Sequence, residues 1–187
     1  MPLWVLIGLN LLLFMATEII KRVDPEFFYE FVLFLGLIPA IILERPWAII
    51  TSMFLHSGVW HILANMLTLY FFGRYLCVLI GEKKFLLIYF VGGIVAGIFY
   101  ILLGPSYTPA IGASGAVFAL GGTLAVMRPR LRVFVFPIPV PLPLWAAIIG
   151  VFLVLSFFPN VAWQAHLGGL LFGLVTGYFL RKRAQFY

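Results

Sequence analysis

The stretch IGASGAVFAL, residues 111–120, places Ser114 between pairs of small residues at the head of an apolar run. Small side chains allow a second backbone to come close to such a serine. The stretch therefore has two interpretations: Ser114 is packing material in a crowded membrane helix, or it is a nucleophile beside which a carbonyl group can lie. The composition, the other apolar runs and the remaining polar residues distinguish between the two.

The composition is that of a membrane protein. Of 187 residues, 64% are hydrophobic and 10% are charged, and the mean hydropathy is +1.15. A water-soluble domain of this length needs a larger polar surface. The sequence therefore predicts an all-α membrane protein that crosses the bilayer several times and forms one domain over residues 1–187. The single cysteine, Cys77, has no second cysteine with which to form an intrachain disulfide.

Six apolar runs are candidates for membrane-spanning helices, and together they predict a six-helix bundle. Some are shorter than the ~20 residues that a hydrocarbon core of ~30 Å requires. The N-terminal run lacks a cationic leading segment and a small-residue cleavage site, so we interpret it as a retained first span. The runs are Leu3–Ile20, Gly58–Ile80, Phe85–Leu103, Ser114–Met127, Leu144–Phe158 and Gln164–Leu180.

The positions of Lys and Arg predict the orientation. The net charge is +6, but the basic residues flank apolar runs, as membrane orientation requires, which argues against nucleic-acid binding. The connections after the second, fourth and sixth runs are basic, whereas those after the third and fifth carry no charge. We therefore expect both termini in the cytoplasm. The basic residues are Lys83, Lys84, Arg128, Arg130, Arg132, Arg181, Lys182 and Arg183.

Two connections are unusual. The first outer connection, residues 23–57, contains the apolar string FFYEFVLFLGLIPAIILERPWAII, which Pro39 and Pro46 interrupt. We expect short helices partly embedded in the outer leaflet, and a re-entrant seventh span is the alternative. On the inner side, FPIPVPLPL at residues 136–144 has a proline at every second position. This pattern favours an extended connector, and a proline-rich ligand for a partner is the alternative.

Four polar residues lie near the outer ends of predicted spans, where polar residues are frequently functional. His61 and Asn65, in the string HILAN, are four residues apart and share one helix face. Ser114 begins the fourth run, and His166 lies near the start of the sixth. Ser114 and His166 both lie about 20 Å above the basic residues at the inner ends of their runs, and therefore at one level in the membrane.

A set of small residues predicts that Ser114 and His166 meet. Glycines repeat at four-residue spacing on the sixth run, and such a stripe lets a neighbouring helix approach closely. The fourth run has small residues to pack against it. We therefore expect the imidazole of His166 within hydrogen-bond distance of the Ser114 hydroxyl. The glycines concerned are Gly112 and Gly115 near the start of the fourth run and Gly169, Gly173 and Gly177 on the sixth.

The remaining residues restrict the chemistry. The metal-binding motif HExxH does not occur, and no acidic residue lies in the middle of a run, so neither a zinc protease nor a pair of catalytic aspartates is expected. A dyad fits, with Ser114 as nucleophile and His166 as general base and then general acid, without metal or cofactor. The candidates for stabilising an oxyanion are the Asn65 amide, His61 and the backbone N–H of Ser114.

Three strings resemble the rhomboid family of intramembrane serine proteases. They are HILAN at 61–65, GASG at 112–115 and AHLGGLLFG at 165–173, in the order that the family uses and within a chain of six apolar runs. The resemblance covers nearly the whole chain. It implies a six-helix membrane domain that cleaves single-span membrane proteins within or near their transmembrane segment.

The resemblance also implies roles for individual residues. Ser114 and His166 match the catalytic dyad of the family, and His61 and Asn65 match its oxyanion-side pair. The fifth run, Leu144–Phe158, matches the helix said to open for the substrate. Six runs without an added seventh are typical of the prokaryotic form. We therefore expect a prokaryotic cell membrane, with the active site toward its outer side.

Two positions depart from the family pattern. The family often has a tyrosine one turn after the serine, stacking on the histidine, whereas Phe118 can stack but has no hydroxyl to donate. The family often has Trp-Arg in the first outer connection, whereas this chain has Trp47-Ala48, with Arg45 two residues earlier. The first departure concerns the orientation of the histidine, and the second concerns the stability of the connection.

We interpret His56 as loop packing.

Two other functions compete with proteolysis. A non-catalytic relative would bind membrane clients and route them through locally thinned bilayer, but such relatives usually lack the serine or the histidine, and this chain has both. A small transporter would call for intramembrane acidic residues or an inverted repeat, and we find neither in the sequence. The expected partners of the enzyme are the lipid bilayer and single-span protein substrates, with no nucleic acid.

Overall fold

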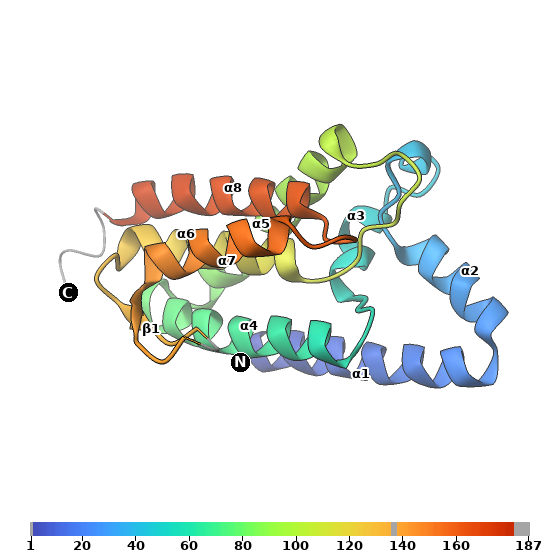
Figure 1. Ribbon diagram of the computed structural model, residues 1–187, viewed down its shortest axis with the longest axis horizontal. Helices are drawn as coiled ribbons and strands as arrows, with labels where there is room; N and C mark the ends of the chain where they lie inside the picture. Colours follow the sequence, from blue (N-terminus) through green and yellow to red (C-terminus); the bar gives the residue numbers. More distant parts are fainter. Residues whose placement is uncertain (1, 136–137, 182–187) are drawn as a thin grey trace.

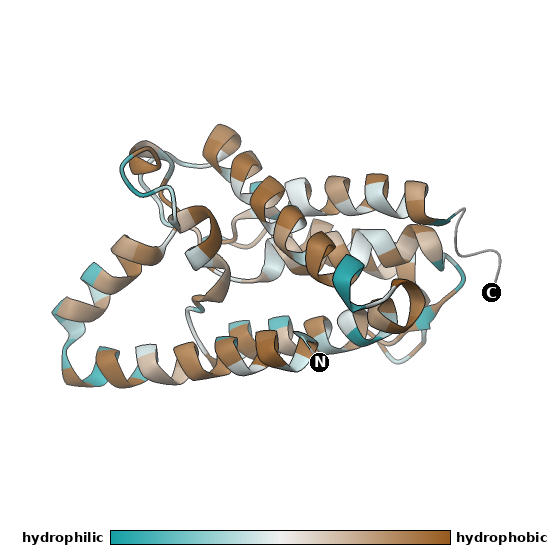
Figure 2. Ribbon diagram, turned by 180° about the vertical axis from the view of Figure 1, so that it is seen from behind, coloured by the Kyte–Doolittle hydropathy of each residue, from teal (hydrophilic) through white to brown (hydrophobic). Residues whose placement is uncertain are grey.

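The structure, a computed structural model, describes residues 2–135 and 138–181. Within them the chain is mostly helical, and its helices lie side by side in a bundle (Figure 1). Hydrophobic residues predominate along most of these helices (Figure 2). The exposed side chains include Leu12, Phe71 and Leu87, each more than 60% accessible. An apolar surface of this kind is suited to contact with lipid.

In the described part of the chain, three helices are long and apolar enough to cross a membrane: α1 (Pro2–Val23), α4 (Val59–Ile80) and α5 (Glu82–Leu103). Each has 22 residues, which corresponds to a length of ~33 Å at the rise of an α-helix. This length matches a hydrocarbon core of ~30 Å. The chain is therefore a membrane protein by the length and composition of its helices.

Three further helices complete the bundle. They are α6 (Ser114–Met127), α7 (Leu144–Ser156) and α8 (Trp163–Arg181), and α6 and α7 are apolar but shorter than a full span. Each of the six predicted runs coincides with one of the six helices, and no end differs by more than three residues. Helix α6 forms the centre of the core, because 12 of its 14 residues are buried.

The first outer connection consists of short helices: α2 (Pro25–Leu35), η1 (Pro39–Ile41), α3 (Ala48–Thr51) and η2 (Ser52–Phe54). The Asp24 side chain accepts a hydrogen bond from the Phe27 N–H and so caps the start of α2. None of the residues of α2 is buried. It lies beside the outward end of α1, away from the centre of the bundle (Figure 1).

Three side chains hold the C-terminal end of α2. Arg45 Nη1, Trp47 Nε1 and Thr51 Oγ1 donate to successive carbonyl oxygens of its last turn, at 2.7, 3.0 and 2.7 Å. The last carbonyl groups of a helix lack intrahelical partners, so these bonds satisfy acceptors that would otherwise be open. The accepting residues are Leu33, Phe34 and Leu35. Arg45 and Trp47 thus stabilise the connection although the Trp-Arg pair of the family is absent.

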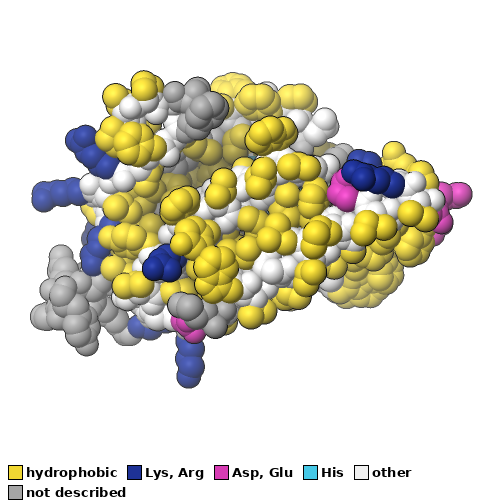
Figure 3. All heavy atoms as spheres, turned by 90° about the horizontal axis from the view of Figure 1, so that it is seen from below, with side chains coloured by type: hydrophobic (Ala, Val, Ile, Leu, Met, Phe, Trp, Pro, Cys, Tyr) yellow, Lys and Arg dark blue, Asp and Glu magenta, His cyan; other side chains and the backbone are white. Residues whose placement is uncertain are grey.

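The connection between α6 and α7 is a short hairpin. Strand β1 (Arg132–Val133) pairs antiparallel with β2 (Leu142–Pro143), with Val133 opposite Leu142. Residues 136–137 of the proline-rich string, and Lys182 and Arg183 among the expected inner charges, lie outside the described residues. Figure 3 shows exposed Lys and Arg side chains at one end of a largely hydrophobic face, and a mixed acidic and basic group at the opposite end.

Candidate active site

Ser114 is the first residue of α6, and backbone contacts fix the turn that leads into it. Gly112 has φ +123°, a left-handed conformation that favours glycine. Its N–H donates to the Ser52 carbonyl oxygen at 2.8 Å, and two residues earlier Ala110 forms a bridge with Leu37. The start of α6 is therefore tied to the first outer connection. The Ser114 N–H belongs to the first turn of the helix, where N–H groups have no intrahelical acceptor.

The hydrogen bond expected between Ser114 and His166 is present. The Ser114 hydroxyl oxygen lies 2.8 Å from His166 Nε2. His166 belongs to α8 and is only 5% exposed. Its Nδ1 is buried and has no hydrogen-bond partner among the described residues. The pair is thus a hydroxyl and an imidazole joined at one ring nitrogen, with no acid on the other nitrogen within the described part of the chain.

Glycines on α8 allow this contact. A Cβ added at Gly169 would overlap the carbonyl oxygen of Gly115, and a Cβ added at Gly173 would overlap that of Ala119. Because these obstacles are backbone atoms of α6, they cannot move aside as a flexible side chain would. The two helices are therefore closer than any larger residue at either position would permit, as the glycine stripe predicts. This approach brings His166 to the start of α6.

An aromatic ring stacks on the histidine. The Phe118 ring, one turn after Ser114, lies 4.6 Å from the His166 ring between centroids, with an interplanar angle of 30°. The stacking expected from the sequence is present. The Phe118 ring also meets that of Phe152 of α7 edge-on, with the centroids 6.1 Å apart. Phe118 thus connects the histidine with α7.

The two other predicted polar residues, His61 and Asn65, differ in what their side chains contact. The imidazole of His61 faces the turn before Ser114. A Cβ atom added to Gly112 in this turn would lie 2.7 Å from His61 Nε2 and 3.8 Å from the Ser114 hydroxyl oxygen, so both atoms lie close to Gly112. Asn65 is buried, and its amide Nδ2 donates to the His61 carbonyl oxygen within the same helix, at 2.9 Å. Among the described residues, no hydrogen bond joins Asn65 to Ser114.

The sequence predicts only loop packing for His56. The structure shows which residue its ring contacts. His56 is 5% exposed, and its ring meets that of His61 edge-on at 4.9 Å. Burial, together with a smaller effect of the neighbouring His61, lowers the pKa of His56 to about 4. His56 therefore packs as expected, but its ring packs against His61, which is a candidate site residue. Its neighbour Ser57 contacts His61 Nδ1 through both its backbone N–H and its hydroxyl, and nothing in the sequence indicated this contact.

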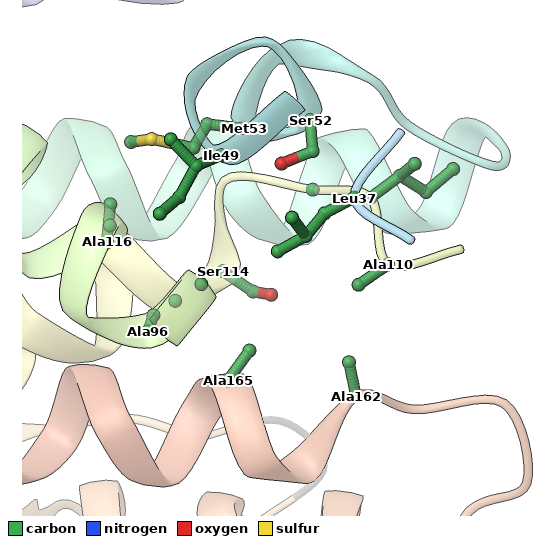
Figure 4. A pocket seen from close by; sticks show the side chains of 15 residues that line it. Leu37, Ile49, Ser52, Met53, Ala96, Ala110, Ser114, Ala116, Ala162 and Ala165 are labelled. Atoms are coloured by element: carbon green, nitrogen blue, oxygen red, sulfur yellow. The ribbon is translucent and has the colours of Figure 1, made fainter. Parts of the chain in front are cut away.

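A small cavity of about 30 Å³ adjoins Ser114. In Figure 4 the Ser114 hydroxyl points into the space between the start of α6 and the start of α8, where Ala162 and Ala165 face it. The walls are largely small residues, with Met53 and Ile49 above. The cavity is large enough for about two water molecules. Within the described ranges, no group of three or more His, Cys, Asp or Glu side chains could hold a metal ion.

Comparisons with known proteins point to one family. The Rhomboid domain family matches residues 43–183. The chain is 28% identical over 158 residues to Rhomboid protein 1, mitochondrial, of Saccharomyces cerevisiae, covering 74% of this chain and 43% of that protein. It is 35% identical over 135 residues to RHOMBOID-like protein 9, chloroplastic, of Arabidopsis thaliana, covering 71% and 31%. A Bacillus subtilis relative, YdcA, whose name assigns it provisionally to the rhomboid proteases, is 28% identical over 143 residues, covering 74% and 69%.

The chain spans less than half the length of the yeast and Arabidopsis relatives. The relatives come from mitochondria, chloroplasts and a bacterium, so they do not narrow the source of this chain. The matched family region contains all three strings that carry the resemblance, and it includes both Ser114 and His166. By this match, which covers about three quarters of the sequence, the chain belongs to the rhomboid family.

Proposed function

We propose that the protein is an intramembrane serine endopeptidase that cleaves single-span membrane proteins within or near their transmembrane segment. The observation that carries this proposal is the 2.8 Å contact between the Ser114 hydroxyl oxygen and His166 Nε2 beside a cavity at the start of α6. A hydroxyl at hydrogen-bond distance from a base is the arrangement that activates serine as a nucleophile. Membership of the rhomboid family supports the same function.

The first half of the reaction is acylation of Ser114. The hydroxyl oxygen attacks the carbonyl carbon of the scissile peptide, its proton passes to His166 Nε2, and the carbonyl electrons move onto oxygen. The C–N bond then breaks, and His166 gives its proton to the leaving nitrogen. The products of this half are a free amine and an ester on Ser114.

The second half is hydrolysis of that ester. Water gives a proton to His166 Nε2 and attacks the ester carbonyl, and the proton returns to the serine oxygen as the acid leaves. The cavity of about 30 Å³ beside Ser114 provides space for the water. The enzyme returns to its starting state with the proton back on the Ser114 hydroxyl, and one water molecule has been consumed for one peptide bond.

The oxyanion formed in both halves requires hydrogen-bond donors. The Ser114 N–H lies at the start of α6, where the helix dipole also favours negative charge. His61 supplies a second donor from Nε2, which faces the Gly112 turn. Asn65 is the third candidate, because its Nδ2 carries two hydrogens and the bond to the His61 carbonyl oxygen uses only one of them.

We propose that all six helices cross the bilayer, with α2, η1, α3 and η2 partly embedded in its outer leaflet. From the basic residues at the inner ends of α4, α6 and α8 we infer that both termini are cytoplasmic and that the active site lies toward the outer side of the membrane. We propose that this membrane is a prokaryotic cell membrane. Helix α7 would be the one that moves to admit substrate.

Cleavage of a reporter tests the proposal. The protein is purified, reconstituted in liposomes with a single-span reporter protein, and the cleaved fragments are quantified. Ser114→Ala should reduce the rate by at least about 10³-fold, because nucleophile and base act as a unit. Ser106→Ala is the matched control, since Ser106 is exposed in the connection between α5 and α6. It should cleave at the wild-type rate.

Other outcomes would overturn the proposal. Cleavage that persists in Ser114→Ala would exclude this serine as the nucleophile. If neither protein cleaves but both retain the reporter in a pull-down, the chain binds clients without catalysis. Labelling of Ser114 by a serine-directed phosphonate, blocked in His166→Ala, would show independently of any substrate that the pair is reactive.

A further inference from the structure

The imidazole of His61 has different groups at its two nitrogens. At Nδ1, the backbone N–H of Ser57 donates a hydrogen bond of 3.4 Å, and the Ser57 hydroxyl oxygen lies 3.1 Å from the same nitrogen. At Nε2, the ring faces Gly112, where an added Cβ would lie 2.7 Å from Nε2 and 3.8 Å from the Ser114 hydroxyl oxygen. One edge of the ring is therefore held by Ser57, and the other faces the reaction site.

The contact at Nδ1 determines which nitrogen carries the proton. A backbone N–H can only donate, so Nδ1 must accept and must have a free lone pair. A neutral imidazole with an unprotonated Nδ1 carries its hydrogen on Nε2. The Ser57 hydroxyl can rotate to donate to the same lone pair. Both groups of Ser57 therefore favour the tautomer in which the N–H bond of His61 points toward Ser114.

The neighbours of Ser57 in the chain support this contact. Ser57 follows His56, whose buried ring packs edge-on against the His61 ring at an angle of 63°. It precedes Gly58, the extended residue before α4 begins. Packing from His56 restrains rotation of the His61 ring, while Ser57 fills the Nδ1 side. Two consecutive residues thus hold the ring in place.

We propose that Ser57 is a positioning residue that fixes the tautomer of His61, so that His61 Nε2–H donates a hydrogen bond to the oxyanion of the tetrahedral intermediate. No proton leaves His61 in this step, and no bond to it forms or breaks. The catalytic part of this inference rests on the proposed protease function. The tautomer itself does not, because it follows from the contacts of the resting protein.

Nitrogen NMR of the purified protein in detergent tests the tautomer without substrate. The chain has three histidines, so ¹⁵N-histidine labelling gives three rings, and a His61→Gln sample identifies the signals of His61. The wild type should show a protonated Nε2 and an unprotonated Nδ1 for His61. The opposite assignment in the wild type would overturn the proposal directly.

A pair of variants with the same side-chain shape then tests Ser57. Ser57→Asp places a carboxylate at Nδ1, where it competes with the 3.4 Å bond from the backbone N–H of residue 57. The charged acceptor is the stronger partner, so it should draw the proton onto Nδ1 and remove the donor at Nε2. Ser57→Asn can still donate to Nδ1 and should keep the wild-type tautomer. Removing one donor from an oxyanion site costs ~10²–10³ in kcat. We expect Ser57→Asp to lower kcat by at least about tenfold with little change in KM, and Ser57→Asn to stay near wild type.

The outcomes separate the two proposals. Equal NMR spectra and equal kcat for Ser57→Asp and Ser57→Asn, in folded proteins with matching melting temperatures, would refute the positioning role. A wild type with the expected tautomer but no Ser114-dependent cleavage would refute the protease function and the catalytic part of this inference, while the tautomer assignment would stand.

Discussion

Helices α7 and α8 both pack against α6, but in opposite ways. Along α8, Gly169, Gly173 and Gly177 leave no room for a single added carbon, because each faces a backbone carbonyl oxygen of α6. On α7, Gly150 has no atom within 4 Å of an added Cβ. Only three residues of α7 are buried, all in its first half, whereas Phe157 near its end is 87% exposed.

The two interfaces allow different amounts of movement: the α6–α8 interface fixes the positions of its side chains, whereas the α6–α7 interface leaves α7 freer to move. Backbone-to-backbone contact between α6 and α8 cannot slide without steric overlap, so it maintains the distance between Ser114 and His166. Helix α7 has three buried residues and α8 has seven, so we expect displacement of α7 to require less free energy than displacement of α8. Phe118 is where the two interfaces meet, because its ring contacts His166 of α8 and Phe152 of α7.

Replacing one glycine on each helix should give the largest difference. Gly173→Ala places a methyl group against the Ala119 carbonyl oxygen of α6 and forces the helices apart, so we expect a loss of at least about 3 kcal/mol in the free energy of unfolding. Gly150→Ala is the matched control on α7 and should change it by no more than about 0.5 kcal/mol. Reversible unfolding in mixed detergent micelles measures both. Equal losses would show that α7 packs as tightly as α8.

The phenylalanine between the interfaces should show a smaller effect, on catalysis. Phe118→Leu removes the ring stacked on His166 while keeping an apolar side chain, and a stacked pair contributes about 0.5–1.5 kcal/mol. If that energy orients the histidine, kcat should fall by up to about tenfold. Phe152→Leu removes only the edge contact from α7 and should leave kcat within about twofold. A larger fall in Phe152→Leu would mean that α7 controls the histidine.

Two hydroxyl groups provide the finest comparison. Thr123 Oγ1 of α6 contacts the Gly173 carbonyl oxygen of α8 at 3.1 Å, as well as the Ala119 carbonyl oxygen of its own helix. Thr123→Val keeps the shape and should lower stability by about 0.6 kcal/mol, a typical value for a hydrogen bond between membrane helices. On α7, Ser156 Oγ bonds to the Phe152 carbonyl oxygen of its own helix and to no other described residue. Ser156→Ala should therefore have almost no effect on the unfolding midpoint.

Patterns repeated along one helix allowed the sequence to predict part of this arrangement. Hydrophobic runs gave the six helices to within three residues, and the glycine spacing on α8 predicted the approach that brings His166 to Ser114. Both are periodic signals, and both depend on which face of a helix is small or apolar. Stacking of Phe118 followed from its position one turn after Ser114.

Contacts made by connecting segments could not be predicted in this way. The bonds from Arg45, Trp47 and Thr51 to α2 and those from Ser57 to His61 depend on the path of a loop rather than on a helical period. The expectation for Asn65 was incomplete for a related reason. Sharing a helix face with His61 also puts its amide within reach of the His61 carbonyl oxygen, and this local bond uses one of its two donor hydrogens.

The capped end of α2 has a consequence for comparing sequences. Because side chains from 45 to 51 replace water as partners of the last carbonyl groups, α2 can rest at the hydrocarbon boundary without exposing open acceptors to lipid. The three donors follow one another as Arg-x-Trp-x-x-x-Thr. In homologues without the Trp-Arg pair, this seven-residue signature would identify chains that anchor their outer segment in the same manner.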